Sequence, residues 1–158
     1  MKNLNSIGLH QDKAEELANK LNELLANYSI FYQNTRGFHW NIKGEKFFEL
    51  HLKFEELYND LLLKIDEVAE RILTLGHTPE HSYSQYAKTS TIKESKKVSD
   101  GLIAVEQILE GFKTTIVMQR EILALASDAN DEGTNALMSD YIGFQEKQVW
   151  MYSSFLKK

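Results

Sequence analysis

The chain has 158 residues, 42% of them hydrophobic and 26% charged, which is ordinary for one soluble globular domain with a sizeable core. Its 18 Lys and Arg against 23 Asp and Glu give a net charge of -5, which argues against a surface built mainly to hold nucleic acid. Because there is no cysteine, disulfides, thiolate metal sites and cysteine nucleophiles are excluded.

The N-terminal stretch, MKNLNSIGLHQDKAEELANKLNELL, is amphipathic and acidic and has no apolar signal-peptide region. No later run is apolar enough to span a bilayer, and the lack of cysteine fits a reducing compartment. We therefore expect a soluble, unprocessed, cytoplasmic protein that folds as a single domain over residues 1–158 and has no membrane partner.

Two long helices are predicted in the first half of the chain. Apolar and aromatic residues recur at spacings of three, four and seven along residues 12–41, which is one face of a helix. A second such pattern covers residues 47–75 and ends at Gly76 and Pro79. The first face carries Leu17, Leu21, Leu24, Leu25, Tyr28, Tyr32 and His39, and the second carries Phe47, Phe54, Leu61, Ile65, Val68, Ile72 and Leu75.

The second half predicts two more long helices after a polar crossover. The crossover, HTPEHSYSQYAKTSTIKESKK, has room for one short helix. A third long helix is expected to start near Ser99 as its N-cap. The break SDANDEGT separates it from a last helix, in which we expect Trp150 and Met151 in the core. Four helices with two short connections and one long crossover predict an all-α, ferritin-like four-helix bundle.

The second helix carries four potential metal ligands, His51, Glu55, Asp66 and Glu70. At about 100° per residue they fall within roughly a 100° sector beside the apolar stripe. His51 with Glu55, and Asp66 with Glu70, are i,i+4 pairs, so each pair shares a face across one turn. Roughly 16 Å of helix rise separates Glu55 from Asp66, whereas metal–ligand bonds are about 2 Å long, so one helix cannot bring both pairs to one ion.

An antiparallel copy of the same helix would complete both pairs. His51 and Glu70 are equally far from the midpoint between residues 60 and 61, and so are Glu55 and Asp66. A two-fold axis at that midpoint sets His51 opposite Glu70 of the partner subunit, and Glu55 opposite the partner's Asp66. The spacing therefore predicts two equal sites that only a dimer completes.

His39 closes the apolar face of the first helix, where that helix would pack against the start of the second. It is therefore a candidate second imidazole for the site that holds His51. Two imidazoles and up to three carboxylates without sulfur suit iron, manganese or zinc better than copper(I). A divalent cation would also offset the repulsion between carboxylates crowded in a subunit interface.

Each of these residues also has a purely structural interpretation. Glu55, Asp66 and Glu70, taken singly, are typical surface charges of a helix. A lone His39 or His51 is typical of a satisfied core or interface histidine. The joint spacing and its two-fold symmetry favour a metal, but the residues by themselves leave both interpretations open.

The run GFHWNIKGEKFFELHLKFEELYNDLLLKIDEVAERILTLG resembles the signature of the Dps family, the mini-ferritins. The resemblance extends over nearly the whole chain, through the C-terminal QEKQVWMYSSFL. It implies a four-helix subunit assembled into a hollow dodecamer built from two-fold dimers, with ferroxidase sites at the two-fold interfaces. The implied ligands are His39, His51 and Glu55 of one subunit with Asp66 and Glu70 of its neighbour. Some members have Asp at the position of Glu55. Glu55 is also an acidic oxygen ligand.

The resemblance also implies a reaction. Fe(II) is expected to be oxidised by hydrogen peroxide, or by oxygen, at a dinuclear or mononuclear site, and the ferric mineral is stored in the shell as protection against oxidative stress. Trp40, next to His39, resembles the aromatic residue that the family has near the site and could donate an electron to trap stray oxidant. Packing in the interface is the equally open alternative for Trp40.

Asp128, Asp131 and Glu132 lie in the stretch SDANDEGT, where the family places acidic three-fold pores. A ring of three such residues would attract cations. The structural alternative is a helix cap with loop charges, since Asp131 could cap the last helix.

Direct DNA binding is expected to be weak or absent. Family members that bind DNA often use a terminal tail rich in Lys and Arg, whereas the terminal bases here are Lys2, Lys13, Lys157 and Lys158. Around a shell even these contacts could add up. A nucleoid-associated DNA-binding shell is therefore one alternative to the ferroxidase, and a structural bundle with a degenerate site is another.

Overall fold

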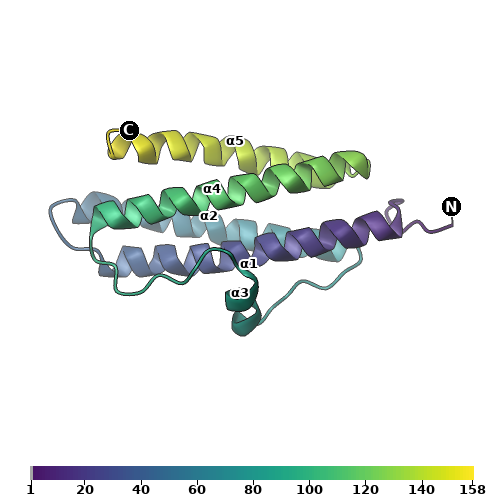
Figure 1. Cartoon of the computed structure of the whole chain (residues 1–158), viewed down its shortest axis with the longest axis horizontal. Coiled ribbons are helices and arrows are strands. Elements are labelled where there is room, and N and C mark those ends of the chain that lie inside the picture. Colours follow the sequence, from purple (N-terminus) through teal and green to yellow (C-terminus); the bar gives the residue numbers. More distant parts are fainter. Residues whose placement is uncertain (1) are drawn as a thin grey trace.

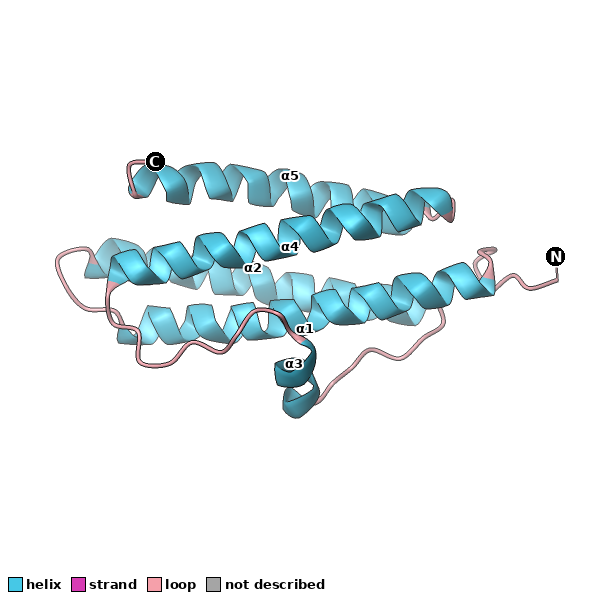
Figure 2. Ribbon diagram, viewed as in Figure 1, coloured by secondary structure: helices cyan, strands magenta, loops and turns pink. Residues whose placement is uncertain are grey.

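The computed structural model describes residues 2–158 and consists of five helices, α1 (Gln11–Asn41), α2 (Phe47–Thr74), α3 (Tyr83–Thr89), α4 (Gly101–Asp128) and α5 (Glu132–Phe155). Figure 1 shows α1 beside α2 and α4 beside α5, each pair running antiparallel. The crossover between α2 and α4 returns along α1 and carries the short α3 on the outside of the bundle (Figure 2). This arrangement confirms the all-α four-helix bundle with a short helix in its long crossover. None of the helices within residues 2–158 is long and apolar enough to cross a bilayer.

The crossover is held against α1 by two buried or half-buried asparagines. The side-chain oxygen of Asn27 accepts hydrogen bonds from the backbone N–H groups of Thr91 and Ile92 at 3.1 and 3.0 Å. Asn34 donates to the carbonyl of Lys93 at 2.8 Å and accepts from the backbone of Ser95 at 2.9 Å. The long connection therefore has a fixed path, and it delivers the chain to the start of α4.

The start of α4 differs by one residue from the prediction. Asp100, not Ser99, is the N-cap, and its carboxylate accepts hydrogen bonds from the backbone N–H groups of Leu102 and Ile103 at 2.8 and 3.1 Å. Both residue types are good caps. The backbone of Ser99 is used differently, because its carbonyl accepts from the N–H of Lys43 at 2.9 Å.

A polar network crosses the middle of an otherwise apolar core. Gln145 donates to the hydroxyl of Tyr28 at 2.7 Å and accepts from Gln119 at 2.9 Å and from Thr115 at 2.8 Å. The Tyr28 hydroxyl donates to Gln119 in turn. All four side chains are buried, and each is hydrogen-bonded, as buried polar groups must be to avoid a large desolvation cost.

The placement of Trp150 and Met151 in the core was wrong. The side chain of Trp150 is 65% exposed and that of Met151 36% exposed, whereas Met138, Tyr152 and the polar Gln145 lie inside. The prediction took Trp150 and Met151 as part of the buried face of the last helix and did not include Gln145 in that face. Because Gln145 is buried through its hydrogen bonds, the buried face is turned away from the one that apolar residues alone indicated.

Candidate metal centre

The two predicted histidine ligands meet where the end of α1 packs on the start of α2. The Nδ1 atom of His39 lies 2.6 Å from the carbonyl oxygen of His51, and the Nδ1 atom of His51 lies 2.7 Å from the carbonyl oxygen of His39. A carbonyl oxygen only accepts, so each Nδ1 must carry the proton and donate it. In the neutral imidazoles each Nε2 then keeps its lone pair, which is the arrangement of metal-binding histidines.

Aromatic contacts fix the orientation of both imidazoles. The rings of His39 and His51 are stacked, with centroids 3.7 Å apart and planes 12° apart. Phe47 stacks on the other face of His51 at 4.9 Å, and the edge-on ring of Tyr58 contacts His39 at 5.3 Å. His39 is buried and His51 half-buried. The pair is thus pre-organised by its own chain, as a precise binding site requires.

The three carboxylates lie along α2 at different depths. Glu55 follows His51 by one helical turn and is half-buried, whereas Asp66 and Glu70 are exposed further along the helix. Within residues 2–158, no hydrogen bond or ion pair engages the carboxylate of Asp66 or Glu70. Nor do any three His, Asp or Glu side chains of this part of the chain lie close enough together to hold a metal ion. The structure brings the two histidines together and leaves the second acidic pair apart.

Large apolar side chains are exposed on the same face of α2 as these ligands. At about 100° per residue, the ligands and the exposed apolar residues share a sector of roughly 120°. Phe48 is 84% exposed and Leu63 66% exposed, and contiguous apolar surface of this kind marks an interaction site. Phe48 and Leu73, like His51 and Glu70, are equally far from the midpoint between residues 60 and 61. The stripe consists of Phe48, Leu52, Leu62, Leu63 and Leu73.

Trp40 lies at the surface beside the histidine pair, with 56% of its side chain exposed. The guanidinium carbon of Arg36 lies 4.8 Å from the centre of its ring, and also 5.5 Å from that of Tyr32 and 5.8 Å from that of Tyr58. The sequence interpretation did not single out Arg36 or Tyr58, and it named Tyr32 only as part of the apolar face of the first helix. The signal for Arg36 was the i,i+4 spacing of Tyr32, Arg36 and Trp40 on α1, which places all three on one side of that helix.

The predicted pore residues occupy the junction of α4 and α5 in three different ways. Asp131 is buried, caps α5 through the backbone N–H of Thr134, and pairs with Arg71 at 2.6 Å. Asp128 is exposed and pairs with Lys13 at 2.5 Å, a hydrogen bond that raises the pKa of that lysine. Glu132 is exposed on the first turn of α5. The cap that was the alternative for Asp131 is therefore present.

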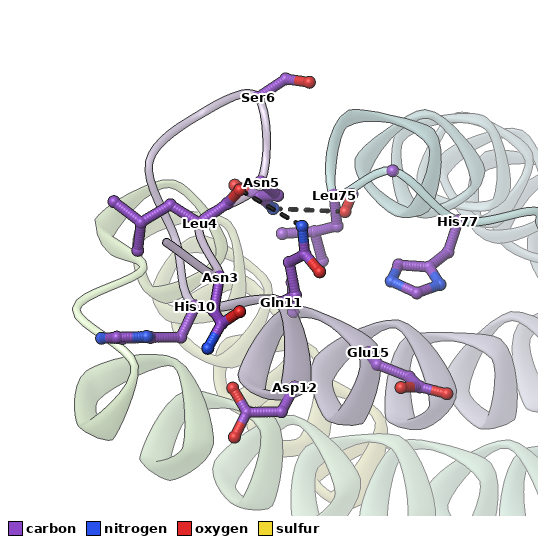
Figure 3. A pocket seen from close by; sticks show the side chains of 12 residues that line it. Asn3, Leu4, Asn5, Ser6, His10, Gln11, Asp12, Glu15, Leu75 and His77 are labelled. Atoms are coloured by element: carbon purple, nitrogen blue, oxygen red, sulfur yellow. Dashed lines mark hydrogen bonds between the residues drawn. The ribbon is translucent and has the colours of Figure 1, made fainter. Parts of the chain in front are cut away.

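A cavity of about 840 Å³ lies elsewhere, at the end of the bundle where the N-terminal residues meet the end of α2 (Figure 3). His10 and His77 line it, together with Asp12 and Glu15. Figure 3 shows the two imidazoles on opposite sides of this cavity. It contains none of the five predicted ligands, so the cavity is not the candidate centre.

The bundle core is not the candidate centre either. Ferritin-like carboxylate proteins hold their metals there with inward-facing glutamates and histidines from the four helices. Here the hydrogen-bonded network in the middle of the core consists of neutral side chains, namely Tyr28, Thr115, Gln119 and Gln145. The five predicted ligands lie instead on the outer face of α2 and at the end of α1.

This fold defines a ferritin-like protein, and the ferritin-like domain family matches residues 18–158. A Dps protein from Vibrio cholerae O1, described as a member of a broad superfamily of ferritin-like diiron-carboxylate proteins, is 55% identical. Its crystal structure superposes on this chain with a TM-score of 0.97, and the superposition covers 99% of this chain and 98% of the Vibrio chain.

Two further relatives agree. A DNA protection during starvation protein from Porphyromonas gingivalis is 40% identical over 151 residues, which are 96% of this chain and 95% of that protein. The crystal structure of a Dps protein from Bacillus brevis is 32% identical, with a TM-score of 0.89 over 92% of this chain and 97% of its own. The chain belongs to the Dps family of ferritin-like proteins.

Proposed function

We propose that this protein is a ferroxidase and iron-storage shell. It oxidises Fe(II) with hydrogen peroxide or oxygen at sites between subunits and stores the ferric mineral, which protects the cell against oxidative stress. The observation that carries this proposal is the reciprocal hydrogen bonding of His39 and His51, which leaves both Nε2 atoms available as ligands. Iron is the substrate of this reaction.

The missing carboxylates come from a second copy of the chain. An antiparallel partner helix places Glu70 of the partner subunit near His51 and the partner's Asp66 near Glu55, and two-fold symmetry creates two equal sites. The exposure of Phe48 and Leu73 supports this register, because the same axis sets each of them opposite the other in the partner, where both would be buried. Such dimers assemble into the dodecamer that the family resemblance implies.

The ligand set suits the reaction. Imidazole nitrogens and carboxylate oxygens bind Fe(II), and the carboxylates favour the harder, more highly charged Fe(III). Two Fe(II) ions give up one electron each, and peroxide accepts both electrons together with two protons to become two waters. Because the O–O bond receives two electrons at one place, no hydroxyl radical is released.

Entry of iron is assigned to the junction of α4 and α5. Asp128 and Glu132 are exposed there and can present negative charge to incoming cations. Asp131 contributes differently, since its pairing with Arg71 and its capping of α5 hold the junction in shape. A three-fold arrangement of Asp128 and Glu132 would attract Fe(II) as the acidic rings of cation channels do.

The experiment is a titration of Fe(II)-loaded protein with hydrogen peroxide in the absence of oxygen, followed by ferric absorbance and by a spin trap for hydroxyl radical. The proposal predicts that two Fe(II) ions disappear for each peroxide and that the spin trap stays silent. Consumption of one Fe(II) per peroxide with abundant trapped radical, as in protein-free buffer, would contradict it.

The names of the relatives favour DNA protection as a second candidate function. The N-terminal segment of this chain does not extend as a basic tail, because Asn5 accepts from the backbone N–H of Leu9 at 2.9 Å and donates to the carbonyl of Leu75 at 3.3 Å. We therefore infer weak direct DNA binding. Gel retardation at physiological salt tests this inference, and a tight, salt-sensitive complex would favour the second function over the first.

A further inference from the structure

A column of aromatic rings leads away from the histidine pair into the seam between α1 and α2. The edge-on ring of Tyr58 contacts His39 at 5.3 Å between centroids, and Tyr32 contacts Tyr58 at 6.0 Å. Tyr58 follows His51 by two turns on the same face of α2. A phenol therefore lies one ring away from an imidazole that the proposed site uses to bind iron.

Residues 2–158 make several cation–ring contacts. Near the histidines, those contacts all come from Arg36, whose positive charge lies over the aromatic rings. Its guanidinium lies closest to Trp40, at 4.8 Å from the ring centre. A cation is attracted to a neutral ring, but it repels a ring that has lost an electron and become positive. Arg36 thus makes Trp40 harder to oxidise to its radical cation.

Arg36 does not make a tyrosine harder to oxidise in this way, because a tyrosine loses its proton together with its electron. The product is a neutral radical, which the charge of Arg36 does not repel, and the nearby cation disfavours keeping the proton on the oxidised phenol. Tyr58 is half-buried, so its proton can reach water. Trp40 also points away from His39, since successive helical residues diverge by about 100°.

We propose that Tyr58, rather than Trp40, supplies the second electron when only one Fe(II) occupies a site. This inference rests on the proposed function and deepens it, because it explains how a mononuclear site could reduce peroxide without releasing hydroxyl radical. Tyr32, in contact with Tyr58, shares the resulting radical.

The step balances in atoms and electrons. Fe(II) gives one electron and becomes Fe(III), and Tyr58 gives one electron and its phenol proton and becomes a neutral tyrosyl radical. Hydrogen peroxide takes up both electrons and the phenol proton, its O–O bond breaks, and one water and one hydroxide form.

The test uses the assembled protein with one Fe(II) per site, mixed with hydrogen peroxide and frozen for electron paramagnetic resonance. We expect a tyrosyl signal in the wild type that changes when the protein is grown with ring-deuterated tyrosine. Tyr58→Phe keeps the ring and its packing but should lose this signal and release spin-trappable hydroxyl radical. Tyr83→Phe is the matched control, since Tyr83 is 92% exposed on α3 and should leave the signal intact.

Arg36→Gln removes the charge and should move part of the radical to Trp40, which the deuterated-tyrosine label distinguishes from the tyrosyl signal. An indolyl signal in the wild type, or a tyrosyl signal that survives Tyr58→Phe, would overturn the inference. Neither result would touch the proposed function, whose test is the oxidation of two Fe(II) ions per peroxide at fully loaded sites. A wild type that oxidises Fe(II) no faster than buffer would remove both.

Discussion

The bundle core and the outer face of α2 differ in whether their polar side chains have partners within the chain. In the core, Tyr28, Gln119 and Gln145 satisfy one another within a single chain. On the outer face, Asp66 and Glu70 stand exposed beside uncovered leucines, and no partner within residues 2–158 engages their carboxylates. One copy of the chain supplies partners for the polar groups of the core network, whereas residues 2–158 supply none for the carboxylates of Asp66 and Glu70.

The two regions therefore differ in what they can offer to a ligand. A buried network that is fully hydrogen-bonded adds specificity to a fold but offers no free ligand. An exposed face that combines carboxylates with large apolar side chains is costly in a lone subunit and favourable once a second copy covers it. The histidine pair His39 and His51 lies between these regions. Its rings are held in place by stacking and by the Nδ1 hydrogen bonds, and no hydrogen bond within residues 2–158 engages either Nε2 atom.

Removing both histidines is expected to have the largest effect. His39→Ala/His51→Ala should lower peroxide-dependent Fe(II) oxidation by more than about 100-fold, since even indirect partners of metal ligands change activity by 10- to 100-fold. Stopped-flow ferric absorbance measures the rate. His77→Ala/His81→Ala removes two histidines outside the candidate centre and should keep the wild-type rate. Equal losses in both double variants would show that the position of the histidines is irrelevant.

Two neighbouring leucines of α2 separate folding from assembly. Leu61 is fully buried, so Leu61→Ala should cost about 2–5 kcal/mol of unfolding free energy. Leu63 is 66% exposed in the subunit, so Leu63→Ala should change subunit stability by less than about 0.5 kcal/mol but weaken self-association. Urea unfolding at low protein concentration measures the first quantity and sedimentation measures the second. Similar unfolding losses in both variants would contradict the assignment of the two faces.

Breaking the core network tests whether that region matters for stability alone. Gln145→Leu leaves the buried amide of Gln119 without its acceptor and should lower the unfolding free energy by about 1–3 kcal/mol. Fe(II) oxidation by the folded protein should be retained. Gln148→Leu, one turn along on the half-buried side of α5, is the control and should stay within about 0.5 kcal/mol of the wild type. Loss of oxidation in a folded Gln145→Leu protein would mean that the core takes part in the chemistry.

Burial of three tyrosines predicts a dependence of stability on pH. Burial raises the pKa of Tyr28, Tyr141 and Tyr152, so these phenols keep their protons in the folded chain when the unfolded chain loses them. The stability they contribute is present below about pH 10 and lost above it, by about 1.4 kcal/mol per pH unit for each tyrosine.

Tyr152→Phe tests this sign with little cost at neutral pH, because the Tyr152 hydroxyl is buried without a hydrogen-bond partner. The variant should lose stability less steeply than the wild type between pH 10 and 11 in urea titrations. Tyr83→Phe, at an exposed tyrosine, should keep the wild-type slope. A wild-type stability that is flat or rising across this range would refute the assignment.

Much of the fold could be predicted because the helices are long and their apolar residues recur regularly. The bounds of α1 and α2 follow from this periodicity to within a residue. The buried face of α5 could not be predicted from this periodicity, because the polar Gln145 is buried and the apolar Trp150 is exposed. Apolar periodicity cannot identify a polar residue that is buried through hydrogen bonds made by residues on other helices.

For the candidate site too, features of a single helix could be predicted from the sequence, and features that depend on packing between helices could not. The spacing of His51, Glu55, Asp66 and Glu70 is a property of one helix and is readable from the sequence. The hydrogen bonds that fix the tautomers of His39 and His51 depend on how α1 packs on α2, and the ring contacts of Tyr58 depend on the same packing. Arg71 as the partner of Asp131 was likewise out of reach, because sixty positions separate the two.

The central claim is that no single subunit owns a complete iron-oxidising centre. Co-refolding equal amounts of His39→Ala/His51→Ala and Asp66→Ala/Glu70→Ala chains tests it most directly, because a mixed dimer combines the intact histidines of one chain with the intact carboxylates of the other. Each variant alone should be inactive, and the mixture should recover about one quarter of the wild-type sites, since half the dimers are mixed and each restores one of two sites. A mixture that co-assembles and stays inactive, or an Asp66→Ala/Glu70→Ala protein that oxidises Fe(II) at the wild-type rate by itself, would contradict the claim.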